Sequence, residues 1–306
     1  MPCAVFAIPL DLFRSMKFSI CTPSFRQFDW LKLCSASIQD QEGVEVDHIV
    51  QDAGTGSVLE TWMHGRPRTR LYVEKDEGMF DAINRGWRRA TGDYVAQLNC
   101  DEQYLPGALK NVGSFFETHP EIDVVYADSL IMDQSGNLRS YWKAIRVTGF
   151  RVAAGGISNP TAAIFFRRRL LDEGFYYDPH WKCVGDAEWS RAVLAAGKSS
   201  ATLAIPTSVY AVTGKNLSTT AESAAEIAEW EATSSMLTRL LKWPVRAYNA
   251  VFRKILEPPT RILSSVSYYR PGQPDSRHRV TDITLSTRWP LDLYSAQRPE
   301  PHREIS

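Results

Sequence analysis

The stretch EKDEGMFDAINRGWRRATGDYVAQLNCDE, residues 74–102, decides the fold class. Apolar residues recur at every fourth position from Met79 to Trp87, and this spacing predicts a helix over 79–90. After a glycine-containing turn, YVAQLN at 94–99 has the apolar content of a buried strand. A helix that leads directly into such a strand is the repeating unit of an α/β sheet, so we expect this unit to recur along the chain.

The same alternation extends to both sides of this stretch. Short apolar runs predict strands at 18–22, 44–52, 70–74, 94–99, 124–128 and 162–166. Helical spacing predicts helices at 28–38, 79–90, 106–118 and 186–196. Residues 131–151 indicate a hairpin instead. The pattern predicts one α/β domain with a mainly parallel central sheet flanked by helices.

Four segments follow from the distribution of these patterns. We predict an N-terminal extension at 1–16, the α/β domain at 17–212, a helical extension at 213–270 and a proline-rich, loosely ordered tail at 271–306. Within the helical extension, 221–243 is predicted to be helical, and Pro244 is expected to break or kink the helix.

The segment after Pro244 carries an apolar stripe formed by Val245, Tyr248, Phe252 and Ile255, among many lysines and arginines. Two interpretations stay open. Residues 236–261 lie on an anionic membrane surface, or the helix packs against the core and its basic face is solvated.

Composition excludes several classes of protein. The 306 residues contain 35 Lys and Arg against 35 Asp and Glu, so no overall charge favours nucleic acid as a partner. Five scattered cysteines form no C-x-x-C pair, which predicts a protein of a reducing, cytoplasmic compartment without a disulfide framework. The sequence holds no phosphate loop, H-E-x-x-H or G-x-S-x-G motif, and Leu59 replaces the third glycine that a dinucleotide-binding motif would need.

Acidic residues follow several of the predicted strands. They are Asp52, Asp76, Asp101 with Glu102, and Asp186 with Glu188. In open α/β sheets the carboxyl ends of the strands meet at one crevice, so we expect these side chains to converge there. Asn99 to Glu102 delivers three oxygen-bearing side chains in four residues, which suits a hard divalent cation. A polar turn in which Asp101 caps the next segment remains the alternative.

Four segments together resemble a family 2 glycosyltransferase of the GT-A fold. They are FSICTPSFRQFDWLKLCSASIQDQ (18–41), HIVQDAGTGSV (48–58), residues 74–102 and SNPTAAIFFRRRLLDEGFYYDPHWKCVGDAEWSRAV (158–193). The resemblance runs in the family's order from about residue 17 to residue 212. It is specific for the family and unspecific for the substrate.

On the donor side, the resemblance implies that Thr22 and Pro23 frame the base of a nucleoside diphosphate sugar. Asp52 would accept a hydrogen bond from a ring nitrogen of that base. Asp76 and Gly78 would border the ribose and the diphosphate.

On the metal and catalytic side, the resemblance implies that Asp101 is the principal protein ligand to Mn²⁺ or Mg²⁺, with Glu102 near it. Asn99 stands where the family has an acid and would help to hold the ribose. Asp186 matches the catalytic base, and Arg191 matches an arginine one helical turn further along that contacts the nucleotide sugar.

Three further residues are candidates for the acceptor side: Trp181, His180 and Asn159. Trp181 lies in a polar loop before Asp186, so we expect its ring to stack on a sugar, whereas Trp142 is expected to belong to the core. His180 either orients the acceptor or is a surface-loop histidine. Asn159 replaces a histidine that many relatives of the family carry.

The resemblance implies a metal-dependent, inverting hexosyltransferase that moves a sugar to a hydroxyl acceptor. A cation would neutralise the departing diphosphate, and a carboxylate would take the acceptor's proton. The acceptor would be a surface polysaccharide or a lipid-linked glycan, and the enzyme would be cytoplasmic and peripheral on the inner face of the membrane. Two alternatives remain: a non-catalytic nucleotide-sugar-binding protein and, with less support, a nucleotidyltransferase.

Overall fold

A computed structural model describes residues 16–155, 159–214, 216 and 221–295 of the chain. The predicted N-terminal extension therefore lies outside the described residues, apart from Met16.

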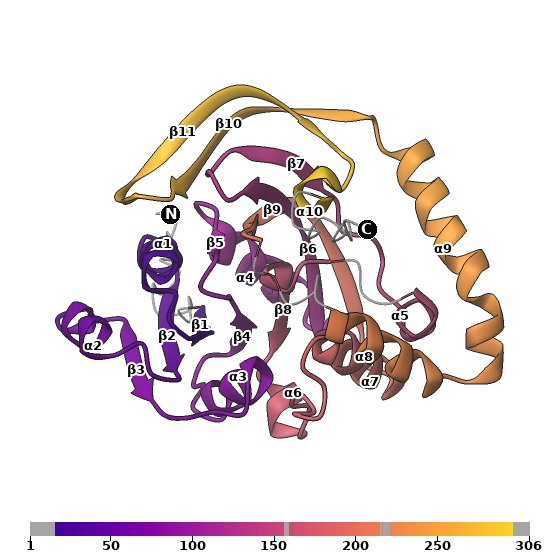
Figure 1. Cartoon of the computed structure of the whole chain (residues 1–306), viewed down its shortest axis with the longest axis horizontal. Coiled ribbons are helices and arrows are strands. Elements are labelled where there is room, and N and C mark those ends of the chain that lie inside the picture. Colours follow the sequence, from indigo (N-terminus) through magenta and orange to yellow (C-terminus); the bar gives the residue numbers. More distant parts are fainter. Residues whose placement is uncertain (1–15, 156–158, 215, 217–220, 296–306) are drawn as a thin grey trace, which may run out of the picture.

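The first hundred residues form one edge of the central sheet (Figure 1). Its parallel strands lie in the order β3-β2-β1-β4. The elements are β1 (Lys17–Ser24), α1 (Phe28–Gln39), β2 (Glu45–Asp52), α2 (Ser57–Met63), β3 (Thr69–Val73), α3 (Met79–Trp87) and β4 (Tyr94–Gln97). This order confirms the α/β units predicted from the sequence pattern.

The rest of the sheet is mixed. Its elements are β5 (Glu102–Tyr104), α4 (Ala108–Thr118), β6 (Val124–Asp133), β7 (Leu138–Trp142), α5 (Gly149–Gly155), β8 (Ile164–Arg167), α6 (Arg169–Asp172), α7 (Gly185–Ala195) and β9 (Ser200–Val212). Strand β8 runs antiparallel to both β4 and β6, and β6 pairs antiparallel with β7 but parallel with β9. The α/β class with flanking helices is confirmed, but the prediction of a mainly parallel sheet is wrong for this half.

Two layers of helices cover the sheet. Apolar side chains of α1 and α4 pack with β1 and β4 in one cluster, around Phe18 and Phe116. Side chains of α3 and α7 pack in a second cluster on other side chains of the same strands, where Trp87 stacks on Tyr177 at 4.5 Å between ring centroids. Since successive strand residues point to opposite faces, one strand can serve both clusters.

Gly92 fixes how β4 enters the sheet. Its backbone N–H donates to Ser19 Oγ (2.9 Å), and a Cβ atom at this position would lie 2.6 Å from the backbone nitrogen of Ser19. Any other residue would collide with the β1 backbone, so glycine permits this approach. The register of β4 against β1 in turn sets where the chain emerges at Asn99.

The C-terminal helices differ from the prediction in where they break. Helix α8 (Ala221–Ala232) ends before Ser235, which caps α9 (Met236–Leu256) by accepting a hydrogen bond from the Thr238 N–H at 3.2 Å. Pro244 lies inside α9 and does not end it. A serine at an N-cap position favours the start of a new helix, so the boundary between α8 and α9 lies at Ser235 and not at Pro244. No helix among the described residues is long and apolar enough to cross a bilayer.

A long hairpin replaces the end of the predicted helical extension and most of the predicted loose tail. Strands β10 (Thr260–Arg270) and β11 (Gln273–Ser286) pair antiparallel, and α10 (Asp292–Ser295) follows. Pro271 lies in the turn between the strands, where its fixed φ is suitable. Buried Val266, Tyr268 and Leu285 give the hairpin an apolar face. The prolines predict a loosely ordered tail, but the first of them, Pro271, lies in a hairpin turn.

The hairpin arches over the sheet from α9 toward α1 (Figure 1). Gln103 of β5 binds it through a reciprocal pair of hydrogen bonds with the backbone of Tyr269, at 2.9 and 2.6 Å. Arg277 binds Asp40, just after α1, through both carboxylate oxygens at 2.6 and 2.7 Å. Strand β11 also pairs with β7 at Ser286 and Ser140. The hairpin therefore connects the C-terminal part of the described chain to the end of α1, to β5 and to β7.

Candidate active site

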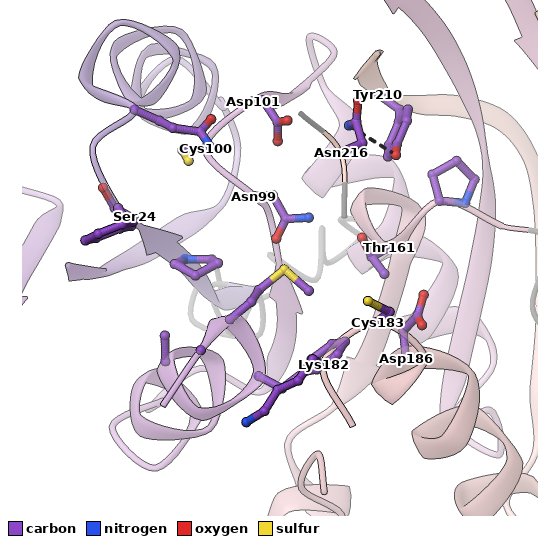
Figure 2. A pocket seen from close by; sticks show the side chains of 18 of the residues that line it. Ser24, Asn99, Cys100, Asp101, Thr161, Lys182, Cys183, Asp186, Tyr210 and Asn216 are labelled. Carbon is purple, nitrogen blue, oxygen red and sulfur yellow. Dashed lines mark hydrogen bonds between the residues drawn. The ribbon is translucent and has the colours of Figure 1, made fainter. Parts of the chain in front are cut away.

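One cavity of about 1170 Å³ lies at the carboxyl ends of β1 and β4 (Figure 2). Ligand sites of open α/β sheets are found at such strand ends. The cavity is lined by these predicted site residues: Pro23, Asp76, Gly78, Asn99, Asp101, Asn159 and Asp186.

The donor-side wall predicted from sequence is formed by the end of β1 and the start of α3. Pro23 lines it together with the exposed ring of Phe25. Asp76 Oδ1 accepts a hydrogen bond from the Gly78 N–H at 3.0 Å, and Gly78 has a φ of 122° that favours glycine. Burial, together with nearby Asp81, raises the pKa of Asp76. The loop thus places the half-buried carboxyl group of Asp76 just before the N-terminus of α3.

The loop after β4 brings two oxygen-bearing side chains to the cavity. Asn99 Oδ1 is buried and has no hydrogen-bond partner among the described residues, and Asp101 also lines the cavity. Burial raises the pKa of Asp101 to about 6. Asn99 Oδ1 thus lacks a hydrogen-bond donor among the described residues, and burial disfavours the negative charge of Asp101. A bound cation would stabilise both groups.

These two side chains fit a hard divalent cation. Within the described ranges, no group of three or more His, Cys, Asp and Glu side chains could hold a metal by itself. Mg²⁺ sites commonly use one or two protein carboxylates and complete the coordination with substrate phosphates and water. Asp101, with Asn99 beside it in the cavity, matches that pattern for a site that a nucleotide's phosphates would complete.

Glu102 was expected to lie near the metal with Asp101, but its side chain does not line the cavity. It lies on β5, is 1% exposed, and accepts a hydrogen bond from the Asn99 N–H at 2.8 Å. Strand β5 pairs with β9, and the Glu102 side chain is buried there next to the loop that carries Asn99 and Asp101. Glu102 therefore holds the loop that carries Asn99.

Asp186 lies on the other side of the cavity, in the first turn of α7. Its Oδ1 accepts a hydrogen bond from the Ala187 N–H at 2.8 Å. The preceding Gly185 packs on Phe80, and a Cβ there would lie 2.6 Å from the ring, so this contact fixes the start of the helix. Burial raises the pKa of Asp186 to about 6, and the charge of Glu226 adds to the effect. A carboxylate with such a pKa can accept a proton near neutral pH.

Two residues predicted to lie at the base, Thr22 and Asp52, have hydrogen-bond partners within the protein and do not line the cavity. Thr22 is fully buried and shares a hydrogen bond with His48 Nε2 at 3.0 Å. Asp52 is also fully buried, and its carboxylate accepts hydrogen bonds from the Gly54 N–H and from the Thr55 N–H and hydroxyl. Neither side chain lines the cavity.

His180, Trp181 and Arg191 also lie off the cavity, because α8 packs beside them. His180 Nε2 lies 3.1 Å from Glu229 of α8. Trp181 is 6% exposed and belongs to the core, contrary to the prediction that it stacks on a sugar. Arg191 pairs with Glu188 at 2.6 Å, and it also donates to Thr233 after α8. The sequence offered no sign that α8 would fold back onto α7.

Other residues of the cavity were missed from sequence. Lys75 and Lys182 add positive charge to the cavity wall, and Lys182 Nζ donates to the backbone oxygen of Glu77 at 2.9 Å. Three aromatic residues also line the cavity: Trp142, Tyr210 and Trp289. Trp142 was predicted to be core, and Trp289 lies in the segment predicted to be loose.

Comparison with known proteins agrees with this architecture. The family described as glycosyl transferase family 2 matches residues 19–175, just over half of the chain. The PGL/p-HBAD biosynthesis glycosyltransferase of Mycobacterium bovis is 27% identical over 179 residues, which cover 56% of this chain and 68% of that protein.

Two solved structures share the fold. S. aureus TarS 1-349 in complex with UDP-GlcNAc has a TM-score of 0.53 at 16% identity, covering 64% of this chain and 58% of that one. The mannosyltransferase PcManGT from Pyrobaculum calidifontis, in complex with GDP-Man and Mn²⁺, has a TM-score of 0.50 at 16% identity, covering 79% and 81% of the two chains.

The mixed sheet, its flanking helices and these two likenesses define an α/β protein of the GT-A class. The chain belongs to glycosyl transferase family 2 and is an enzyme of the glycosyltransferase type. This confirms the family and the enzyme class predicted from the sequence motifs.

Proposed function

We propose that the protein transfers a sugar from a nucleoside diphosphate sugar to a hydroxyl acceptor in glycan biosynthesis, with a divalent metal and with inversion. The proposal rests on one observation: Asp101, after β4, and Asp186, at the start of α7, face one cavity from different elements (Figure 2). The similarity to the M. bovis glycosyltransferase and to PcManGT, which is seen in complex with GDP-Man and Mn²⁺, supports it.

The donor would lie against Pro23 and the loop from Asp76 to Gly78, with its diphosphate near Asp101 and Asn99. Mn²⁺ or Mg²⁺ held by Asp101 would neutralise negative charge on the leaving diphosphate. Lys182 contributes a positive charge at the same wall, and its hydrogen bond to Glu77 orders the loop that borders the diphosphate.

Asp186 is the proposed general base. It would take the proton of the acceptor hydroxyl as the oxygen forms its bond to the anomeric carbon and the bond from that carbon to the diphosphate breaks. Attack opposite the leaving group inverts the anomeric centre in a single displacement. A single displacement forms no covalent sugar intermediate, so no second carboxylate is needed as a nucleophile.

Nucleotide binding tests the donor site without knowledge of the acceptor. We expect calorimetric titration to show that one of UDP, GDP and dTDP binds tightly with Mn²⁺, and that binding weakens when Mn²⁺ is omitted or in the Asp101→Ala variant. The control is Asp172→Ala, because Asp172 is an exposed acid of α6 paired with Arg168. Failure of all three nucleotides to bind would refute the proposal.

We further propose that the protein is peripheral on the inner face of the membrane through α9. Several large apolar side chains of this helix face solvent: Leu240 is 65% and Trp243 is 71% exposed. Two of its polar side chains face the protein: Arg246 pairs with Glu231 at 2.9 Å, and Asn249 accepts a hydrogen bond from Arg151 at 2.6 Å.

Of the predicted stripe, Tyr248 is exposed, whereas Val245 is half-buried beside Gly155 of α5. The wider exposed apolar surface of α9 supports the first of the two interpretations. A helix that only packed on the core would bury its apolar face. Exposed Met236, Leu237 and Tyr248 extend the patch, whereas the side chains of Phe252 and Ile255 lie outside the description. An apolar surface with the nearby exposed cation of Arg239 suits the interface of an anionic bilayer.

Vesicle sedimentation tests this second proposal. The protein is expected to bind vesicles that contain anionic lipid, and the double variant Leu240→Ser with Trp243→Ser is expected to stay in the supernatant. Ile262→Ser is the control, because Ile262 of β10 is equally exposed, at 72%, but lies outside α9. Equal sedimentation of all three proteins would contradict a role for α9.

A further inference from the structure

An aromatic recess forms part of the cavity wall. Trp142 ends β7, Tyr210 belongs to β9, and Trp289 follows β11. The rings of Trp142 and Trp289 meet edge to face at 4.8 Å between centroids, and Tyr210 lies 5.9 Å from Trp289. Three segments that are distant in sequence thus bring large rings to the cavity that contains Asp186.

Two amide side chains accompany these rings. Asn159 lines the cavity and is 4% exposed, yet neither its amide oxygen nor its amide nitrogen has a hydrogen-bond partner within the described residues. Asn216 Nδ2 donates to the Tyr210 hydroxyl at 3.3 Å. A buried amide without hydrogen-bond partners destabilises the protein, and a ligand that supplies those hydrogen bonds would remove this cost.

The position of the recess favours the acceptor over the donor. Figure 2 shows Tyr210, Asn216 and Asp186 on one side of the cavity and Ser24, at the end of β1, on the other. The donor-side loops come from β1, α3 and β4, whereas the aromatic recess comes from β7, β9 and the segment after β11.

Rings combined with amide groups match the chemistry of a sugar. One face of a pyranose presents C–H groups that pack on an aromatic surface, and its hydroxyls need hydrogen-bond donors and acceptors around the rim. An alkyl alcohol would leave Asn159 unsatisfied, and a phosphate would gain nothing from the indole rings.

We propose that Trp142, Tyr210 and Trp289, with Asn159 and Asn216, form an acceptor subsite that binds a pyranose ring. The acceptor is then itself a glycoside, and the enzyme extends an existing sugar. This inference rests on the proposed function, because it assumes that a hydroxyl is delivered to Asp186. Trp289 would be a specificity-determining residue contributed by the hairpin segment.

Saturation-transfer NMR tests the subsite with stated probes: the methyl α- and β-glycosides of glucose, galactose, mannose, rhamnose and N-acetylglucosamine. The protein is first saturated with Mg²⁺, which is diamagnetic, and with the nucleoside diphosphate that binds it. At least one glycoside is expected to bind, and Trp289→Ala should weaken that binding about tenfold or more, with partial recovery in Trp289→Phe. Phe150→Ala is the control, because Phe150 is an exposed aromatic residue of α5 that lies outside the cavity.

Three results would overturn the inference: no glycoside binds, Trp289→Ala binds glycosides as well as the wild type, or Trp289→Ala also loses the nucleotide. The last result would assign the recess to the donor. Nucleotide binding is measured by calorimetry on the same proteins. If no glycoside binds but Mn²⁺-dependent nucleotide binding is intact, the subsite is refuted and the proposed transfer stands. If the wild type binds no nucleotide, the subsite and the proposed transfer are both refuted.

Discussion

The carboxyl group of Asp186 is held where it can gain and lose a proton close to neutral pH. Burial raises its pKa from 3.8 to about 6. Negative charge on Glu226 of α8 adds to the rise, and Glu102 of β5 and Tyr126 of β6 interact electrostatically with the same carboxyl. In the proposed role of general base, Asp186 must be ionised before it can take the acceptor proton.

Transfer activity is therefore expected to fall as pH decreases through about 6, where Asp186 becomes protonated. Asp186→Asn should lower kcat by about 10²–10⁴-fold, because the amide cannot take the proton. Initial rates between pH 5 and 8 check this, and calorimetry at the same pH values shows whether nucleotide binding changes. A variant with near wild-type kcat would exclude Asp186 as the base.

The stability of the fold should respond in the opposite sense. A carboxyl whose pKa is higher in the folded than in the unfolded state destabilises the fold as pH rises from about 3.8 to about 6. Asp186→Asn removes this cost, so we expect a higher Tm than that of the wild type at pH 7.5 and a smaller difference near pH 4. Thermal unfolding followed by circular dichroism measures both, and an equal difference at the two pH values would contradict the assignment.

At the residue scale, sequence motifs predict which side chains at strand ends line the cavity. They do not predict the position of side chains whose partners are distant in sequence. Asp76, Asn99 and Asp101 could be predicted because their position depends only on a strand that ends beside them. Trp181 and Arg191 were misjudged because α8, about 40 residues further along, covers them. No local pattern records such a contact.

At the scale of elements, the β10–β11 hairpin depends on a few polar anchors. Arg277 binds Asp40 through two oxygens and also donates to the backbone oxygen of Tyr104 at 3.0 Å. Gln103 adds its reciprocal pair with Tyr269. These contacts connect the hairpin to α1 and β5, which belong to the donor half of the molecule.

Arg277→Ala is expected to destabilise the protein by about 1–2 kcal/mol, because one partly exposed ion pair and its backbone hydrogen bond are lost. Urea unfolding gives the change, and limited proteolysis should cut the hairpin faster. Arg279→Ala serves as the control, because Arg279 donates to Ser265 within the hairpin itself. Similar behaviour of the two variants would show that Arg277 does not anchor the hairpin.

Helix α9 shows what a periodic pattern can and cannot predict. The spacing of apolar residues predicts an amphipathic helix, but it does not say which face turns inward. Glu231 of α8 and Arg151 of α5 attract the polar side of α9, and these partners decide its orientation. The prolines mislead in a similar way, since Pro244 is tolerated within α9 and Pro271 lies in a hairpin turn.

At the scale of the whole molecule, stability should decrease from the sheet centre toward the hairpin. Strands β1, β4 and β8 have partners on both edges and fully buried apolar residues. The hairpin meets β7 through one described residue pair and exposes Ile262. Regions with few buried contacts open locally at lower free energy.

Hydrogen exchange followed by mass spectrometry is expected to show slow exchange in β1 and β4 and faster exchange in β10 and β11. Nucleotide with Mn²⁺ should increase protection near residues 74–102, whereas a bound glycoside should increase protection around Trp289. Slow exchange of the hairpin in the free protein, equal to that of β4, would contradict this gradient.

The hairpin also sets an order in time. The ribosome has made every predicted donor and base residue that lines the cavity once Asp186 is complete, but Trp289 follows about a hundred residues later. At about 5–20 residues per second, this interval lasts on the order of 5–20 s. The donor-side and base residues of the cavity are thus synthesised before the last residue of the proposed acceptor subsite. If that subsite is needed for transfer, the enzyme becomes competent only after Trp289 has been added and β11 has paired with β10.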